Sequence, residues 1–165
     1  LNEHYLFAGI VLQRGYIVVD VSCFTDRLKD GWNLVSYPYE GSTFLTFASV
    51  LSPAFSYDPV SRSYIEEDTL IAGKGYWISA PSDGQMCFAE ATEVSSFEVT
   101  LLPGWNLIGG PVQPVSASIF EDYPEVVLPI YGYNNALAHF EARGARMLFY
   151  AYWVLAEDTV VVTLE

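Results

Sequence analysis

Apolar and polar residues alternate along short stretches of this chain, and turn-forming residues separate the stretches. Between residues 97 and 102, Phe97, Val99 and Leu101 fall on one face of an extended chain. This period of two is typical of a strand with one buried face. The same reasoning predicts further strands over residues 22–28, 32–37, 85–89, 105–108 and 159–164 and around Trp77 and Trp153.

Turn signals predict how neighbouring strands connect. Asp30-Gly31 and Pro103-Gly104 are turn dipeptides, so we expect the strand before each to form a hairpin with the strand after it. A further hairpin in each half of the chain is predicted at Asp58-Pro59-Val60-Ser61 and at Asn134-Asn135, where different turn residues serve the same purpose.

The hydrophobic period changes to that of a helix in two places. Spacings of i, i+3, i+4 and i+7 over residues 44–51 predict a helix of two turns. A second short helix is predicted near residue 120, with Ser116 or Ser118 as its N-cap. The apolar residues that define the two helices are Phe44, Phe47, Ala48 and Leu51 in the first and Ile119, Phe120 and Tyr123 in the second.

Two stretches of the chain occur twice. Gly31–Pro38 (GWNLVSYP) returns as Gly104–Pro111 (GWNLIGGP), and Gly75–Ile78 (GYWI) returns as Ala151–Val154 (AYWV). The glycines that begin the first motif are 73 residues apart, and from Pro53 onward the copies keep a constant offset of 76 residues. With these two offsets all four tryptophans occupy equivalent places. Internal repetition of this kind predicts two similar structural units.

We therefore predict an all-β protein of two pseudo-repeat modules, residues 24–92 and 93–165. Each module should be a small antiparallel β-barrel or sandwich with one short helix. Residues 1–23 resemble part of the first module and are interpreted as a partial N-terminal repeat. A free half repeat would leave an unpaired strand edge, so we expect it to join the first module, unless a partner supplies the missing half.

Composition and charge exclude several classes of protein. Apolar residues make up 52% of the chain, so it is not a disordered acidic tail. The net charge of −13 disfavours nucleic acid and anionic membrane surfaces. We expect no membrane insertion, because no apolar run reaches the roughly 18 residues of a spanning helix. The chain has no initiating Met or signal-peptide pattern, so we expect a mature or excised segment.

The paired motifs are similar to tandem repeats near the ends of large secreted or cell-surface proteins of bacteria and archaea. Those repeats accompany cohesin, dockerin, fibronectin-like or sorting-signal regions. The resemblance covers residues 24–165, and it rests on the GWNLVS-x-P and GKGYWI motifs. The second copy departs from it, because it lacks the Gly-Lys-Gly turn and has Ala151 where the first has Gly75. The resemblance implies an extracellular or cell-surface location and, as partners, other domains of a larger surface protein. It brings no catalytic residue.

The aromatic residues are the main candidates for binding. Trp32, Trp77, Trp105 and Trp153 form the repeat signature, and residues that recur beside turns and strand starts are usually architectural, so we expect them to pack the two cores. The alternative is a platform on which sugar rings stack. Tyrosines that vary between the copies are better candidates for a surface ligand site, and we select Tyr37, Tyr39 and Tyr57.

Catalytic, metal and cofactor sites are not predicted. His4 and His139 are the only histidines, and zinc-protease, nucleophile-elbow and phosphate-loop motifs are absent. Acidic runs at 66–68 and 121–122 lack the pattern of a calcium loop and are interpreted as solvated turns. Cys23 and Cys87 match no zinc or redox pattern, which leaves two buried thiols or a disulfide.

These observations predict a non-catalytic extracellular repeat module that acts as a spacer, adhesion or interaction unit of a larger surface protein. Its ligand would be a glycan or a protein. The first alternative is a carbohydrate-binding module that uses exposed aromatic residues. The second is a glycosidase fragment, because two carboxylates suffice for that chemistry.

Overall fold

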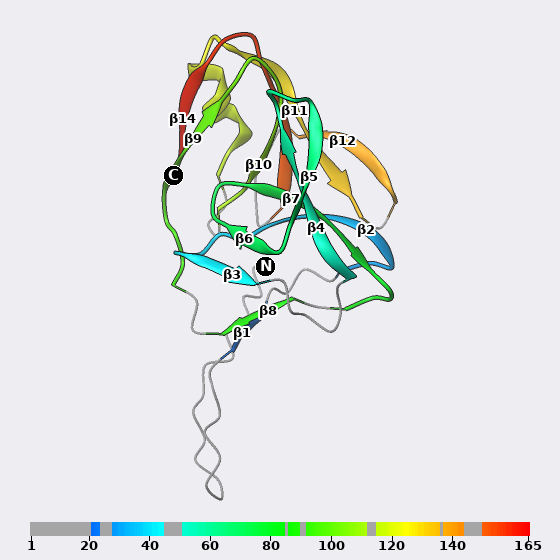
Figure 1. The fold of residues 1–165 in the computed structure, drawn as a ribbon. Helices are drawn as coiled ribbons and strands as arrows, with labels where there is room; N and C mark the ends of the chain where they lie inside the picture. The colour runs from blue at the N-terminus through cyan, green and yellow to red at the C-terminus, as the bar shows by residue number, and fades with distance from the viewer. Residues whose placement is uncertain are drawn as a thin grey trace, which may run out of the picture.

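The structure is a computed structural model (Figure 1). It describes residues 21–23, 28–44, 51–84, 86–89, 92–111, 115–135, 137–143 and 150–165. These residues form fourteen strands in antiparallel sheets and one short 3-10 helix. The predicted all-β class is therefore confirmed. None of the described sheets closes into a barrel, and the arrangement is sandwich-like.

Two four-stranded sheets have the same strand order. The first sheet has the order β2-β7-β4-β5 and the second has the order β10-β13-β11-β12, with equivalent strands in equivalent places. We call residues 24–92 the first half and 93–165 the second half; these boundaries stay predictions. The strands are β2 (Gly31–Ser36), β7 (Gly75–Ala80), β4 (Leu51–Asp58), β5 (Ser63–Glu67), β10 (Gly104–Gly109), β13 (Ala151–Ala156), β11 (Val126–Asn134) and β12 (His139–Arg143).

Three small sheets accompany the large ones. Each is a pair of antiparallel strands, and each pair brings together segments that are distant in sequence. The pairs are β1 (Val21–Cys23) with β8 (Cys87–Ala89), β3 (Ser42–Phe44) with β6 (Thr69–Ile71), and β9 (Phe97–Leu101) with β14 (Val160–Leu164). Figure 1 shows β9 and β14 side by side at one end of the molecule and β1 with β8 at the other.

The predicted hairpins at Asp30-Gly31 and Pro103-Gly104 are wrong. The strand before the second turn, β9, pairs with β14, whereas the strand after it, β10, pairs with β13. Before the first turn β1 pairs with β8, and after it β2 pairs with β7. Each turn is a corner at which the chain passes from one sheet to another.

The asparagine of the GWN motif explains the corner. Asn106 donates from Nδ2 to the carbonyl oxygens of Leu102 (2.8 Å) and Gly104 (2.9 Å) and accepts from Leu102 N (3.0 Å). Its counterpart Asn33 makes the same three bonds. Gly104 has a φ of 104°, a conformation that favours glycine. The side chain thus makes the hydrogen bonds to these backbone groups that a partner strand in a hairpin would otherwise make.

The other two predicted hairpins are confirmed. β4 pairs with β5 around the turn after Asp58, and β11 pairs with β12 around the turn after Asn134. The Asp58 carboxylate accepts hydrogen bonds from Val60 N (3.0 Å) and Ser61 N (3.2 Å). The Asn134 Oδ1 accepts from Leu137 N (3.1 Å). Different side chains therefore close equivalent turns in the same way.

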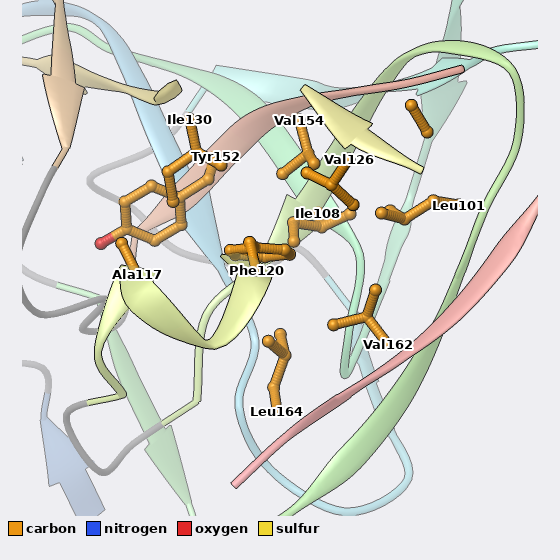
Figure 2. Close-up of a cluster of buried hydrophobic side chains, with 11 residues drawn as sticks. Leu101, Ile108, Ala117, Phe120, Val126, Ile130, Tyr152, Val154, Val162 and Leu164 are labelled. Atoms are coloured by element: carbon orange, nitrogen blue, oxygen red, sulfur yellow. The ribbon is translucent and has the colours of Figure 1, made fainter. Parts of the chain in front are cut away.

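One of the two predicted helices is observed. The 3-10 helix η1 (Ala117–Asp122) begins after Ser116, whose Oγ accepts from Ser118 N at 3.2 Å. Figure 2 shows Ala117 and Phe120 of this helix beside buried side chains from the strands of the second half. For the helix predicted over 44–51, Phe44 and Leu51 lie in strands β3 and β4, and residues 45–50 lie outside the described residues.

Each large sheet has its own hydrophobic core on one face. In the first half this core includes Val35 and Tyr76, and in the second half it includes Tyr152 and Phe120. A third buried cluster, formed by Leu34, Leu107 and Ala151, joins the two halves. Since successive side chains of a strand point to opposite faces, Leu34 faces the other half while Val35 faces its own core.

At two glycines where the halves meet, the copies differ in sequence. A Cβ on Gly75 would lie 2.6 Å from Ala151 Cβ and 2.8 Å from Ile108 O. A Cβ on Gly109 would lie 2.9 Å from Ser36 Cβ. Gly75 is the counterpart of Ala151, and Gly109 is the counterpart of Ser36. The departures between the copies are thus the places where the two sheets need small residues to meet.

The N-terminal segment is described only over residues 21–23, as strand β1, and its pairing with β8 is consistent with the predicted joining of the first half. Residues 1–20 lie outside the described residues. In this pairing Cys23 lies directly opposite Cys87. Opposite residues of an antiparallel pair have Cα separations of about 4.5–5.5 Å, which a disulfide can span, so both alternatives for the cysteines stay open.

Candidate functional site: two aromatic pockets

Two pockets lie against the large sheets, and the described residues that line them are all aromatic. We name each after its exposed tryptophan. The Trp105 pocket has a volume of about 400 Å³, and the Trp32 pocket has a volume of about 470 Å³. The Trp105 pocket is lined by Tyr57, Trp105, Tyr131, Phe140 and Trp153, and the Trp32 pocket is lined by Trp32, Phe55, Tyr64, Trp77 and Tyr133.

The two pockets are built from equivalent residues. Every residue that lines one has its repeat counterpart in the other. In each pocket four rings come from one half, and the fifth is a tyrosine from the other half. Tyr57 of the first half thus lines the Trp105 pocket, and Tyr133 of the second half lines the Trp32 pocket. The pairs are Trp32 and Trp105, Phe55 and Tyr131, Tyr57 and Tyr133, Tyr64 and Phe140, and Trp77 and Trp153.

Strand register brings the rings together. Trp77 on β7 lies opposite Leu34 on β2 and opposite Phe55 on β4. Tyr57, two residues after Phe55, lies opposite Tyr64 on β5. Residues that are opposite one another share a sheet face, so rings from neighbouring strands form a continuous aromatic surface. The second half has the same register.

Aromatic contacts also cross between the halves. The rings of Tyr57 and Trp153 have centroids 4.8 Å apart at 72°, and those of Trp77 and Tyr133 are 4.7 Å apart at 75°. Edge-to-face contacts of this kind contribute about 0.5–1.5 kcal/mol each beyond the area they bury. The contacts that hold the halves together therefore also shape the pockets.

The tryptophans are placed differently from our expectation. Trp32 and Trp105 are 50% and 39% exposed, so the prediction that they pack the cores is wrong. The core face of β2 is occupied by Asn33 and Val35, and alternation puts Trp32 on the opposite face. Trp77 and Trp153 are half-buried and pack against the cluster that joins the halves.

Of the three tyrosines predicted for a surface site, one lines a pocket. Tyr57 is half-buried beside Trp153, and because its counterpart is also a tyrosine, Tyr133, it does not vary between the copies as the prediction assumed. Tyr37 and Tyr39 are buried in the first core, so the prediction of surface positions is wrong for both. Their rings contact one another at 5.5 Å, and burial raises the pKa of Tyr37 above its usual value and that of Tyr39 to about 12. Both follow β2, and their side chains belong to the first hydrophobic core.

Five lining residues were missed by the sequence reasoning: Phe55, Tyr64, Tyr131, Tyr133 and Phe140. A signal for them was present, because aromatic residues recur at these positions with the 76-residue offset and alternate along their strands. Tyr64 and Phe140 are 54% and 51% exposed, which distinguishes them from core residues.

The two pockets differ at their rims. Glu66 on β5 lies opposite Phe55, and the equivalent position beside Tyr131 is Ala142. Ser79 lies opposite Trp32, and the equivalent position beside Trp105 is Leu155. The rim of the Trp32 pocket therefore has a carboxylate and a hydroxyl where that of the Trp105 pocket has two apolar groups.

Glu67, which follows Glu66 on β5, takes part in hydrogen bonds with neighbouring side chains. Burial raises the pKa of Glu67, but hydrogen bonds from Lys74 and Ser56 outweigh this effect and hold the pKa below its usual value. Within the described part of the chain, no group of three or more His, Cys, Asp or Glu side chains is placed to bind a metal ion.

Comparison of the chain with models of known protein families, with curated proteins and with solved structures finds no match. The resemblance to tandem repeats of surface proteins therefore stays a prediction. Among the described residues, no helix is long and apolar enough to cross a membrane.

Proposed function

We propose that this chain is a non-catalytic binding module of a larger extracellular protein and that the two aromatic pockets are its ligand sites. The observation that carries the proposal is the recurrence of five aromatic positions in both halves, with large ring surfaces exposed in each. Among the roles considered from the sequence, this supports an adhesion or interaction unit over a passive spacer.

Exposure of the rings supports a binding role. A spacer needs its aromatic residues only for packing, and exposed apolar surface that gathers into a patch is typical of interaction sites. Volumes of about 400 and 470 Å³ fall within the range of small-molecule sites, about 300–1,000 Å³. Two sites on one module would also bind a polymeric ligand with repeated units more tightly than either site alone, through avidity.

Carbohydrate is the ligand class that these pockets favour. One face of a pyranose ring carries C–H groups with partial positive charge, which pack well on the negative face of an aromatic ring. Planar nucleobases would stack too, but a net charge of −13 repels their phosphates. Among the residues that the structure describes, the ten side chains that line the pockets are uncharged, which fits a glycan without acidic groups.

Tryptophan emission during titration with a panel of soluble glycans tests this proposal. Replacing Trp32 or Trp105 with Ala should each remove one of two binding sites, and the double variant should lose binding. Truncation of a stacked ring weakens a site by about tenfold or more. Val161→Ala, which removes an exposed apolar group outside both pockets, is the control and should leave binding unchanged. A protein that binds none of the glycans would favour the spacer.

A further inference from the structure

Among the described residues, the rim of the Trp32 pocket carries a negative charge, Glu66, at a position where the Trp105 pocket has Ala142. Glu66 lies directly opposite Phe55, which lines the pocket, so the two side chains share a sheet face with Cβ atoms about 4.5–5.5 Å apart. Glu66 is exposed, and its carboxylate pairs with no described residue. Glu67, on the opposite face, is by contrast paired with Lys74.

A cation at this rim would meet two favourable features at once. An exposed ammonium gains from a nearby carboxylate and from the faces of Trp and Tyr rings, and the Trp32 pocket offers both. The net charge of −13 would further raise the local concentration of cations and their rate of association. An acidic sugar would meet repulsion at the same place.

We propose that the Trp32 pocket prefers an amino sugar, a glycan unit with a free protonated amino group, and that the Trp105 pocket makes no such distinction. The inference rests on the proposed glycan binding and adds the substrate class of one of its two sites. In this arrangement the sugar ring stacks on the aromatic surface, and its ammonium group lies at the rim beside Glu66. Ala142 takes the place of this carboxylate in the Trp105 pocket.

An edge strand offers a competing explanation for Glu66. β5 is the outer strand of its sheet, and exposed charges on such strands prevent pairing with other chains. That role requires a charge at the edge but no effect on ligand binding. The two explanations therefore differ in what substitution of Glu66 does to affinity.

Single-pocket variants provide the test. Trp105→Ala leaves the Trp32 pocket, and Trp32→Ala leaves the Trp105 pocket. Each would be titrated with a β-1,4-linked glucosamine oligosaccharide and with its N-acetylated, neutral counterpart of the same length, at low and at high salt. We expect the Trp105→Ala protein to bind the amino form about five- to tenfold more tightly at low salt. The Trp32→Ala protein should bind both forms alike.

Two further substitutions test whether the carboxylate of Glu66 causes the preference for the amino sugar. Glu66→Gln in the Trp105→Ala protein should abolish the preference while retaining affinity for the neutral form. Ala142→Glu in the Trp32→Ala protein should create a preference in the other pocket.

The remaining outcomes separate the inference from the proposed function. Equal binding of both forms that Glu66→Gln does not change would overturn the inference and leave glycan binding intact. A preference of equal size in both single-pocket variants would also overturn it, because the overall charge would then be the cause. Failure of both oligosaccharides to bind either variant would overturn the inference, and failure of the whole glycan panel as well would overturn the proposed glycan binding.

Discussion

A single buried asparagine in each half determines where the chain leaves one sheet and enters another. Asn33 and Asn106 are buried, and each bonds to backbone groups two and four residues earlier. Gly31 and Gly104 adopt positive φ values of 94° and 104° at the same corners. The GWN motif is thus a corner with an exposed tryptophan, and each of its three residues has a distinct physical task.

Replacing Asn106 with Ala should destabilise the protein by about 2–4 kcal/mol. The substitution removes three hydrogen bonds and leaves backbone groups of Leu102 and Gly104 without them, at about 0.5–1.5 kcal/mol each. Urea unfolding measures the change. Thr100→Ala, at an exposed position of the neighbouring strand β9, should change stability little. A loss below about 1 kcal/mol for Asn106→Ala would mean that water replaces the side chain.

Tyr76 makes stability depend on pH in the alkaline range. Its buried hydroxyl accepts from Ile71 N at 3.0 Å, and burial raises its pKa from 10.0 to about 12. The folded state therefore holds this proton more tightly than the unfolded state does. The resulting stabilisation is fully present below pH 10 and is lost as the pH rises from 10 to 12.

Tyr76→Phe should show both consequences. At neutral pH the variant should lose about 1 kcal/mol, because Ile71 N loses its acceptor. Its stability should then decline less steeply than that of the parent protein between pH 10 and pH 12, although Tyr39 still contributes to the decline. Urea unfolding across this range, with tyrosinate absorbance recorded in parallel, provides the measurement. Identical slopes for the two proteins would contradict the assignment to Tyr76.

At the scale of elements, each central strand contributes side chains both to the core of its own half and to the junction between the halves. On β13, Tyr152 and Val154 face the core of the second half, while Ala151 and Trp153 face the first half. The same division applies to β2 and β7. Alternation along a strand thus separates the residues that hold each half together from those that join the halves and line the pockets.

Gly75→Val should disturb the junction between the halves. A Cβ at this position would lie 2.6 Å from Ala151 Cβ and 2.8 Å from Ile108 O, and backbone atoms cannot move aside as a flexible side chain can. We expect a loss of about 3 kcal/mol. Tryptophan emission should also shift to the red, because Trp77 and Trp153 pack across the junction. Thr100→Val, which replaces an exposed hydroxyl with a methyl group on strand β9, is the control. Unchanged emission would show that the substitution leaves the ring contacts of Trp77 and Trp153 across the junction intact.

At the scale of the whole molecule, each pocket needs both halves. Tyr57 comes from the first half and completes the Trp105 pocket, and Tyr133 comes from the second half and completes the Trp32 pocket. The junction between the sheets is therefore part of both proposed sites. Residues of both repeats thus line each pocket.

Substitution of these two tyrosines should have crossed effects. Tyr57→Ala should weaken glycan binding about tenfold in the Trp32→Ala protein, in which only the Trp105 pocket remains, and should hardly affect the Trp105→Ala protein. Tyr133→Ala should do the reverse. Titrations monitored by calorimetry would show this pattern. If each tyrosine instead affected the pocket of its own half, the composite sites would be wrong.

Local patterns in the sequence were sufficient for the all-β class, the two turn-closed hairpins and the helix after Ser116. Each depends on residues that are close in the chain: alternation along β9, side chains that bond to their own turns at Asp58 and Asn134, and an N-cap two residues before the amide it binds. Interactions of this range are encoded by neighbours, so sequence alone specifies them.

Only the tertiary structure decided which strands pair across long separations and which face of each strand meets which surface. The pairing of β9 with β14 spans most of the second half, and the pairing of β1 with β8 most of the first. Alternation along β2 places Trp32 and Val35 on opposite faces of the sheet. Because both faces are partly covered, the alternation alone does not identify the face that packs against the core. The pockets arise where two such faces meet, and their composition follows from packing between residues far apart in sequence, such as Tyr57 with Trp153 and Trp77 with Tyr133.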